Sequence, residues 1–205
     1  MYIAIEGIKG AGKSTLLAQL SQQLNKEGVE FSTFNPTRPM PQNEWWEQAY
    51  SDWQHDDDFM SALYTARANY HALQTNFNQP LVLGDRSILT SIVTRWQSYQ
   101  HDIHGYIQQI LAQEYAVPMP DLVLYLDISL ESASQRLQNR QRDYGLYDET
   151  VQRLQQTKHA YTQLFKCKNE FGLKNIQIQC FDTNQTSSQL FQQVLKYVKN
   201  IALVT

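Results

Sequence analysis

The sequence lacks the features of several protein classes. Its 205 residues contain only two cysteines, Cys167 and Cys180, whose spacing fits neither a metal site nor a disulfide framework, so we expect reduced thiols. It has no apolar run approaching the roughly 18 residues of a membrane span, and no basic segment at its N-terminus. A net charge of -3 does not indicate a protein that binds nucleic acid in general. We therefore expect a cytoplasmic protein that acts on neither membranes nor nucleic acid.

Internal repeats, low-complexity tracts and linkers are also missing. Hydrophobic residues make up 42% and charged residues 18% of the chain, which is ordinary for a globular protein with a substantial core. The simplest expectation is one domain spanning residues 1–205.

The most informative stretch lies near the N-terminus. An apolar run at 2–6 leads into the motif G-x-x-x-x-G-K-S at 7–14, and a helical pattern follows. The glycines let backbone N–H groups surround phosphate oxygens, and the helix adds its positive end. Lys13 should reach the β- and γ-phosphates of ATP, and the Ser14 hydroxyl should bind Mg²⁺. A turn that only joined a strand to a helix would need neither residue. The expected nucleotide-binding set is Gly7, Gly10, Ala11, Gly12, Lys13, Ser14 and Thr15.

Strands and helices alternate along the rest of the chain. The uninterrupted apolar run that precedes Asp85 suits a strand covered on both faces, as does the run that precedes Asp127. Strands are expected at 2–6, 29–34, 81–86, 121–127 and 176–181. Helices are expected from the loop to Gly28 and at 44–53, 89–99, 103–115, 131–141, 149–171 and 187–201. This alternation predicts an α/β P-loop NTPase sandwich, with helices on both faces of a five-stranded parallel sheet.

Three acids at 56–58 precede another helical pattern. They resemble a metal cluster, but acids that open a helix more often interact with its dipole. The apolar face of this helix is expected to carry residues spaced three to four apart, with Arg67 beside it. These residues are Phe59, Leu63, Ala66, Tyr70 and Leu73.

A charged pair ends the third expected strand. Ligands of open α/β sheets bind beyond the carboxyl ends of strands, so Asp85 and Arg86 should converge with the phosphate loop. Asp85 would bind Mg²⁺ through water or accept a proton from the attacking oxygen. It could instead cap the helix that follows.

Three arginines cluster after the fourth strand. Arg136 and Arg140 lie one turn apart, and Arg142 begins a hinge-like stretch. They could form a solvated face. Beside a phosphate loop, they are better interpreted as a lid segment at about 139–150 whose guanidinium groups meet phosphate oxygens.

Several separated segments together resemble one family. They are Glu6 with the phosphate loop, Leu63-Tyr64-Thr65-Ala66-Arg67, Gly84-Asp85-Arg86, the strand 120–127, the arginines from 136 to 142, and Phe181-Asp182-Thr183. In this order they resemble the thymidylate kinase family over nearly the whole chain. The phosphate loop alone is common to many NTPases, whereas the ordered set is far more specific.

The resemblance implies phosphoryl transfer from ATP to a nucleoside monophosphate, with dTMP giving dTDP, in a homodimer. It implies that Arg67 and Leu63 lie at the pyrimidine base and that Arg38 and Arg86 hold the acceptor phosphate. Lys13, Arg140 and Arg142 would neutralise the transferring group, and Arg136 would contact the donor nucleotide. Asp85 would assist through Mg²⁺ or by orienting the acceptor.

The sequence departs from the family on the acceptor side. Lys9 stands where the family has an acid that reads the sugar 3′-hydroxyl, Leu63 replaces an aromatic residue, and Pro39 interrupts the usual T-R-E-P-G-G stretch. Asp85-Arg86-Ser87 also resembles the acid-Arg-Ser motif of deoxynucleoside kinases, so phosphorylation of a nucleoside is an alternative. A nucleotide-binding module without activity is another. A GTPase is disfavoured because no N-K-x-D motif is present.

Overall fold

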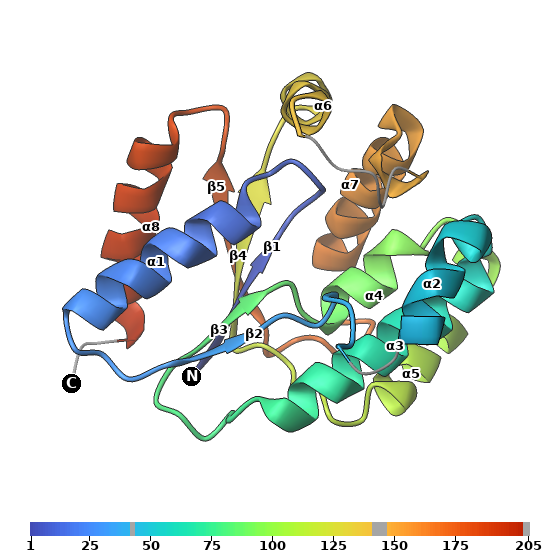
Figure 1. Ribbon diagram of the computed structural model, residues 1–205, viewed down its shortest axis with the longest axis horizontal. Coiled ribbons are helices and arrows are strands. Elements are labelled where there is room, and N and C mark those ends of the chain that lie inside the picture. Colours follow the sequence, from blue (N-terminus) through green and yellow to red (C-terminus); the bar gives the residue numbers. More distant parts are fainter. Residues whose placement is uncertain (42–43, 141–146, 203–205) are drawn as a thin grey trace.

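The computed structural model describes residues 1–41, 44–140 and 147–202 of the chain. Its centre is one all-parallel sheet in the order β2-β3-β1-β4-β5 (Figure 1). The strands are β1 (Tyr2–Glu6), β2 (Ser32–Phe34), β3 (Val82–Asp85), β4 (Leu122–Asp127) and β5 (Gln177–Asp182). The predicted α/β sandwich with a five-stranded parallel sheet is therefore confirmed.

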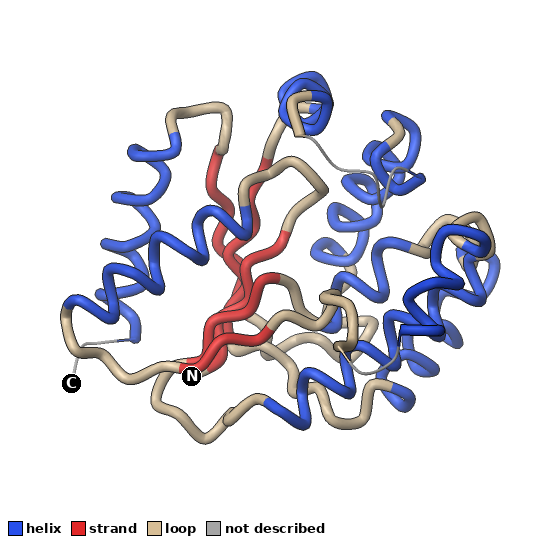
Figure 2. The backbone as a smooth tube through the Cα atoms, viewed as in Figure 1, coloured by secondary structure: helices blue, strands red, loops and turns tan. Residues whose placement is uncertain are grey.

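Helices cover both faces of the sheet, so that the strands form the middle layer (Figure 2). The helices are α1 (Lys13–Lys26), α2 (Glu44–Trp53), α3 (Asp57–Gln74), α4 (Ile88–Thr94), α5 (Ile103–Gln113), α6 (Leu130–Gln138), α7 (Val151–Lys166) and α8 (Ser187–Ala202). Short 3-10 turns are η1 (Gln100–Asp102) and η2 (Tyr147–Glu149). Figure 1 shows α1 and α8 on one side of the sheet and α4, α5 and α7 on the other.

Strand β1 divides the hydrophobic core in two, because its side chains alternate between the faces. Ile3 and Ile5 pack into the cluster that includes α1 and α8. Tyr2 and Ala4 pack into the cluster that includes α4, α5 and α7. All four residues are buried, which explains the continuous apolar run in the sequence.

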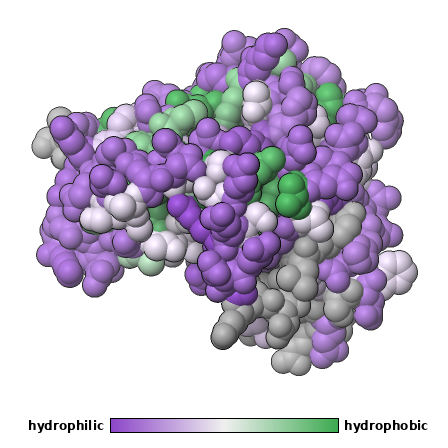
Figure 3. Space-filling view, turned by 90° about the horizontal axis from the view of Figure 1, so that it is seen from above, coloured by the Kyte–Doolittle hydropathy of each residue, from purple (hydrophilic) through white to green (hydrophobic). Residues whose placement is uncertain are grey.

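The strand order places the functional region. From β1 the chain passes to the edge strand β2 and returns to add β3 between β2 and β1, and it then crosses to the other side of β1 to add β4 and β5. This reversal opens a crevice at the carboxyl ends of β1, β3 and β4, where ligands of such sheets bind. Figure 3 looks onto the molecule from this side, and most of the surface that it shows is hydrophilic.

Several predicted boundaries and one helix face differ from the structure. Strand β2 begins at Ser32 rather than residue 29. Helix α4 ends at Thr94 rather than residue 99, because Arg95 leaves the helix to form buried ion pairs. Helix α7 spans only 151–166 of the predicted 149–171, and Thr150 caps its start.

The predicted face of α3 is also rotated. Leu73 is 66% exposed, and Phe59, Ala66 and Tyr70 are only partly buried. The buried residues of this helix are Met60, Leu63, Tyr64, Arg67, Ala68 and Ala72. Arg67 lies within the buried stripe because its guanidinium points into the cavity described below, so a purely apolar pattern could not identify the face.

The acids at 56–58 open α3 as expected. Asp56 is the N-cap residue, and its carboxylate accepts a hydrogen bond from the backbone N–H of Phe59 at 2.8 Å. Asp57 and Asp58 fall in the first turn, where the helix dipole favours negative charge. In the described part of the chain, no three or more His, Cys, Asp or Glu residues are grouped to hold a metal ion.

Candidate active site

The phosphate loop closes tightly between β1 and α1. Gly7, Gly10 and Gly12 have φ angles of 140°, 86° and 96°, a region that other residues rarely adopt. A Cβ at Gly7 would lie 2.6 Å from the Leu126 carbonyl oxygen, and one at Gly10 would lie 2.8 Å from that of Ala133. Both contacts are too close, so this loop path needs glycine at these positions.

Lys13 begins α1 and points back across the loop. Its ammonium donates hydrogen bonds to the carbonyl oxygens of Gly7 and Ile8, both at 2.9 Å. Burial lowers the pKa of Lys13 well below its usual value, and Arg86 lowers it further. Asp85 and Glu6 act in the opposite direction. A triphosphate in the loop would supply the negative charge that this buried ammonium favours.

Ser14 and Asp85 meet in front of the loop. The Ser14 hydroxyl donates to Asp85 Oδ2 at 2.5 Å, which joins the start of α1 to the end of β3. Asp85 is placed by the pairing of β3 with β1, in which it lies opposite Ile5. A hydroxyl and a carboxylate oxygen are ligands that Mg²⁺ prefers, so the pair fits the predicted metal role.

Arg86 follows in a strained backbone conformation. Its φ is 85°, and among the described residues it is the one non-glycine residue with a positive φ. Its backbone N–H donates to the Ile5 carbonyl oxygen at 3.0 Å, and its guanidinium donates to the Thr90 hydroxyl at 3.3 Å. Burial lowers the pKa of Arg86, but Tyr161, Asp85 and Glu6 outweigh burial and raise it overall. The guanidinium therefore remains charged.

A cavity of about 550 Å³ joins these groups to a second region between the β2–α2 loop and α3. It is strongly cationic, although the chain carries a net charge of -3. Its lining includes six cationic side chains and two carboxylates. The cations are Lys9, Lys13, Arg38, Arg67, Arg86 and Arg140, and the carboxylates are Asp85 and Asp148. Such a lining favours ligands with several negative charges.

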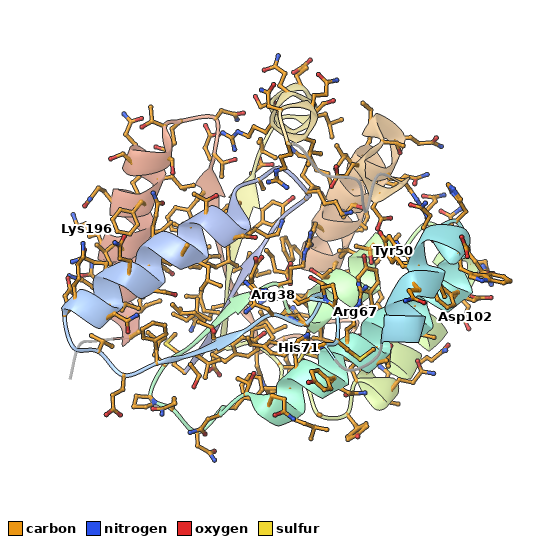
Figure 4. All side chains as sticks on the ribbon, viewed as in Figure 1. Arg38, Tyr50, Arg67, His71, Asp102 and Lys196 are labelled. Carbon is orange, nitrogen blue, oxygen red and sulfur yellow. The ribbon has the colours of Figure 1, made fainter. Side chains whose placement is uncertain are left out.

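The second region of the cavity is built around Arg67. Arg67 is 5% exposed, donates to the Thr37 carbonyl oxygen at 3.3 Å, and lies 5.6 Å from the ring centroids of both Tyr50 and Tyr64. Figure 4 shows Arg38, Tyr50 and Arg67 on the same side of the sheet, near α2 and α3. An aromatic and cationic pocket of this kind can hold a flat base.

Leu63 does not line this cavity. It is fully buried in a small cluster with Met40, Met60 and Tyr64. The next residue, Tyr64, lines the cavity instead. The predicted contact between Leu63 and the base therefore has no geometric support, and Leu63 lies beneath the pocket wall.

The predicted arginines of the lid differ in their positions. Arg140 lines the cavity, whereas Arg142 lies outside the described residues. Arg136 donates to the Thr183 carbonyl oxygen at 2.7 Å and to that of Gly10 at 3.4 Å. It therefore links the phosphate loop to the segment after β5. Thr15 lines the cavity, and Ala11, within the loop, is fully buried.

Asp148 falls within the predicted lid segment at about 139–150, but no role in the site was predicted for it. Its carboxylate lines the cavity, accepts from the Arg95 guanidinium at 3.2 Å, and lies 3.8 Å from the Lys9 ammonium. Burial raises the pKa of Asp148, but Arg95, Lys9 and Arg153 outweigh burial and lower it below the usual value. Lys9 in the phosphate loop could have indicated such an acid, because a buried cation needs a partner of opposite charge.

The thymidylate kinase family model matches residues 5–194. The chain belongs to this family. The protein is a nucleotide kinase. The thymidylate kinase of Acinetobacter baumannii (strain SDF) is 26% identical, with 97% of this chain and 100% of that protein covered. The probable thymidylate kinase of Methanococcus maripaludis is also 26% identical, with 96% and 94% covered.

Solved structures show the same fold. The deoxyadenosine kinase of M. mycoides with bound dATP superposes with a TM-score of 0.72 at 22% identity, covering 97% of this chain and 99% of that one. The same enzyme with products dCMP and a flexible dCDP bound also gives 0.72, at 23% identity, covering 98% of this chain and 100% of that one. The family assignment fits a site that holds a phosphate loop and a second, base-sized pocket in one cavity.

Proposed function

We propose that the protein transfers the γ-phosphoryl group of ATP to dTMP, giving ADP and dTDP. The observation that carries this proposal is the single cavity that joins the phosphate loop to a pocket with its own arginines, Arg38, Arg67 and Arg86. A nucleoside acceptor has no phosphate for Arg38 and Arg86 to hold, whereas a monophosphate does.

The donor half of the reaction follows from the loop. Backbone N–H groups of the loop and the N-terminus of α1 would bind the triphosphate. Lys13, released from its contacts with Gly7 and Ile8, would neutralise charge on the γ-phosphate, and Arg140 would add a second cation. Ser14 and Asp85 would hold Mg²⁺, which neutralises phosphate charge when bound.

The acceptor half depends on positioning. Arg38 and Arg86 would bind the dTMP phosphate, so that one of its oxygens faces the γ-phosphate in line with the leaving group. Arg67 would donate to a carbonyl oxygen of thymine between Tyr50 and Tyr64. A guanidinium has only donors, so it favours a base edge that carries acceptors.

The test is product analysis with a panel of acceptors. Purified protein is incubated with ATP, Mg²⁺ and either a nucleoside monophosphate or a nucleoside, and the products are separated by anion-exchange chromatography. The proposal expects dTDP and ADP in equal amounts from dTMP, and little dTMP from thymidine. Turnover of nucleosides alone would instead identify a deoxynucleoside kinase. Binding of ATP without transfer to any acceptor would favour a nucleotide-binding module.

Two finer proposals concern the setting of the enzyme. In the described residues, none of the helices combines the length and apolar character needed to cross a bilayer. Together with the two unpaired cysteines, this supports a cytoplasmic location. A homodimer is proposed from the family resemblance, and sedimentation velocity would test it.

A further inference from the structure

A buried carboxylate that the proposed reaction does not use lies directly behind the site. Glu6 is the last residue of β1, immediately before the phosphate loop, and its exposed fraction is 0%. In the described residues, no ammonium or guanidinium forms an ion pair with it. A buried carboxylate without a cation is unfavourable unless hydrogen bonds satisfy it, so its partners should reveal its role.

Three hydroxyl groups satisfy Glu6. Ser87 Oγ donates to Oε1 at 2.7 Å, while Thr90 Oγ1 and Tyr161 OH donate to Oε2 at 2.8 and 2.6 Å. Ser87 and Thr90 belong to the start of α4, and Tyr161 belongs to α7. All three hydroxyls act as donors in these contacts, so each turns its single hydrogen toward Glu6.

This arrangement fixes the direction of one contact with Arg86. The Thr90 hydroxyl lines the cavity and lies 3.3 Å from Arg86 Nη1. Since the hydrogen of Thr90 is donated to Glu6, its lone pairs face Arg86 and can accept from the guanidinium. A reversed hydroxyl would place its hydrogen against the Arg86 donor instead. Arg86 needs such support because its backbone conformation is strained.

We propose that Glu6 is a positioning residue for phosphoryl transfer, which acts through the Thr90 hydroxyl to hold the Arg86 guanidinium in place for the acceptor phosphate. This inference rests on the proposed function, in which Arg86 binds that phosphate. Glu6 is not among the residues that line the cavity, so it would act on the acceptor only through its hydrogen-bond partners.

The test compares variants that keep or remove the hydrogen-bond acceptor oxygens of the side chain at position 6. Glu6→Met removes both oxygens, and Thr90→Val removes the hydroxyl with little change in shape. Each should raise KM for dTMP about tenfold, the effect of losing a hydrogen bond to a charged group, with KM for ATP nearly unchanged. Glu6→Gln keeps an oxygen toward Thr90 and Tyr161 while its amide group donates to Ser87, so KM should stay close to that of the wild type. Thr90→Ser keeps the hydroxyl, so its KM for dTMP should also stay close to that of the wild type.

Tyr106→Phe is the matched control. It removes a buried hydrogen bond, from the Tyr106 hydroxyl to the Ser91 carbonyl oxygen at 2.9 Å, that involves none of Glu6, Thr90 and Arg86. It should lower the melting temperature while leaving KM for dTMP nearly unchanged. The double variant Glu6→Met/Thr90→Val should be no worse than either single variant, because both act through one contact.

The outcomes separate this inference from the proposed function. If the wild type phosphorylates no nucleoside monophosphate, the proposed function is wrong. If it phosphorylates dTMP but Glu6→Met and Thr90→Val leave KM for dTMP unchanged, the positioning role is wrong. Additive effects in the double variant, or a Glu6→Gln defect as large as that of Glu6→Met, would also overturn it, since the charge of Glu6 would then act independently of Thr90. Should Glu6→Met fail to fold, Thr90→Val with Thr90→Ser decides.

Discussion

The Lys9 ammonium in the phosphate loop lies 3.8 Å from Asp148 Oδ2 and 3.9 Å from Glu149 Oε1, and all three side chains are largely buried. The extra cation in the loop is thus balanced by acids from η2, far along the chain. The positive charge that Lys9 brings into the loop is therefore offset within this chain, and the cavity keeps its cationic excess.

Removing the charge of Asp148 should destabilise the protein. Asp148→Asn leaves Lys9 and Arg95 buried without a full counter-charge, and we expect a loss of about 3 kcal/mol in the free energy of unfolding. Urea denaturation measures it. Asp127→Asn is the matched control, because Asp127 pairs with Lys158 at 2.7 Å but is 52% exposed, so its loss should stay below about 1 kcal/mol. Equal losses would contradict the buried network.

Stability should fall as pH rises through the titration of Glu114. This residue is 1% exposed, and burial raises its pKa from 4.5 to about 8. Between these values the folded state holds a proton that the unfolded state has released, so the free energy of unfolding decreases as pH rises and the contribution is lost above about 8. Glu114→Gln should be more stable than the wild type at pH 8, by on the order of 2 to 4 kcal/mol. Parallel pH profiles for both proteins would refute this account.

Lys13→Ala tests the donor side. Removing this cation should lower kcat by about three orders of magnitude, because charge compensation in the transition state is lost. The melting temperature should change little, since burial already disfavours the charged ammonium in the free protein. Lys26→Ala, at the exposed end of the same helix, is the control and should keep full activity. Near-normal turnover of Lys13→Ala would show that phosphoryl transfer does not take place at the loop.

Arg67→Ala tests the acceptor side. We expect KM for dTMP to rise about 10- to 100-fold, with a much smaller change in KM for ATP, because a charged hydrogen bond to the base is lost. Leu73→Ala on the same helix is the control, as Leu73 is 66% exposed. Steady-state kinetics with each substrate varied in turn gives both constants. An equal rise in KM for both substrates would contradict the placement of Arg67 in the acceptor pocket.

Much of the fold could be predicted because its signals are local. The glycine spacing specifies the loop at 7–14, and the apolar runs before Asp85 and Asp127 specify strands buried on both faces. Ligands bind at the carboxyl ends of such strands, which predicted that Asp85 and Arg86 lie near the loop. In the structure, both residues line the same cavity as the loop. The roles assigned to these residues remain predictions.

The remaining features depend on contacts that periodicity does not encode. Lys9 meets Asp148 across most of the chain, and no spacing rule connects them. Helix α4 ends before Arg95, short of the predicted residue 99, and the Arg95 guanidinium forms buried ion pairs with Asp57 and Asp148. A step of one residue on α3 rotates a side chain by about 100°, which is why Tyr64 rather than Leu63 faces the cavity.

A crystal structure with a two-headed ligand, in which a chain of five phosphates joins adenosine to thymidine, tests the central claim most directly. The account predicts that the phosphates pass through the loop at 7–14 and contact Lys13, and that the thymine ring lies against Arg67. A thymidine end bound outside this cavity, or a loop that contacts no phosphate, would contradict it.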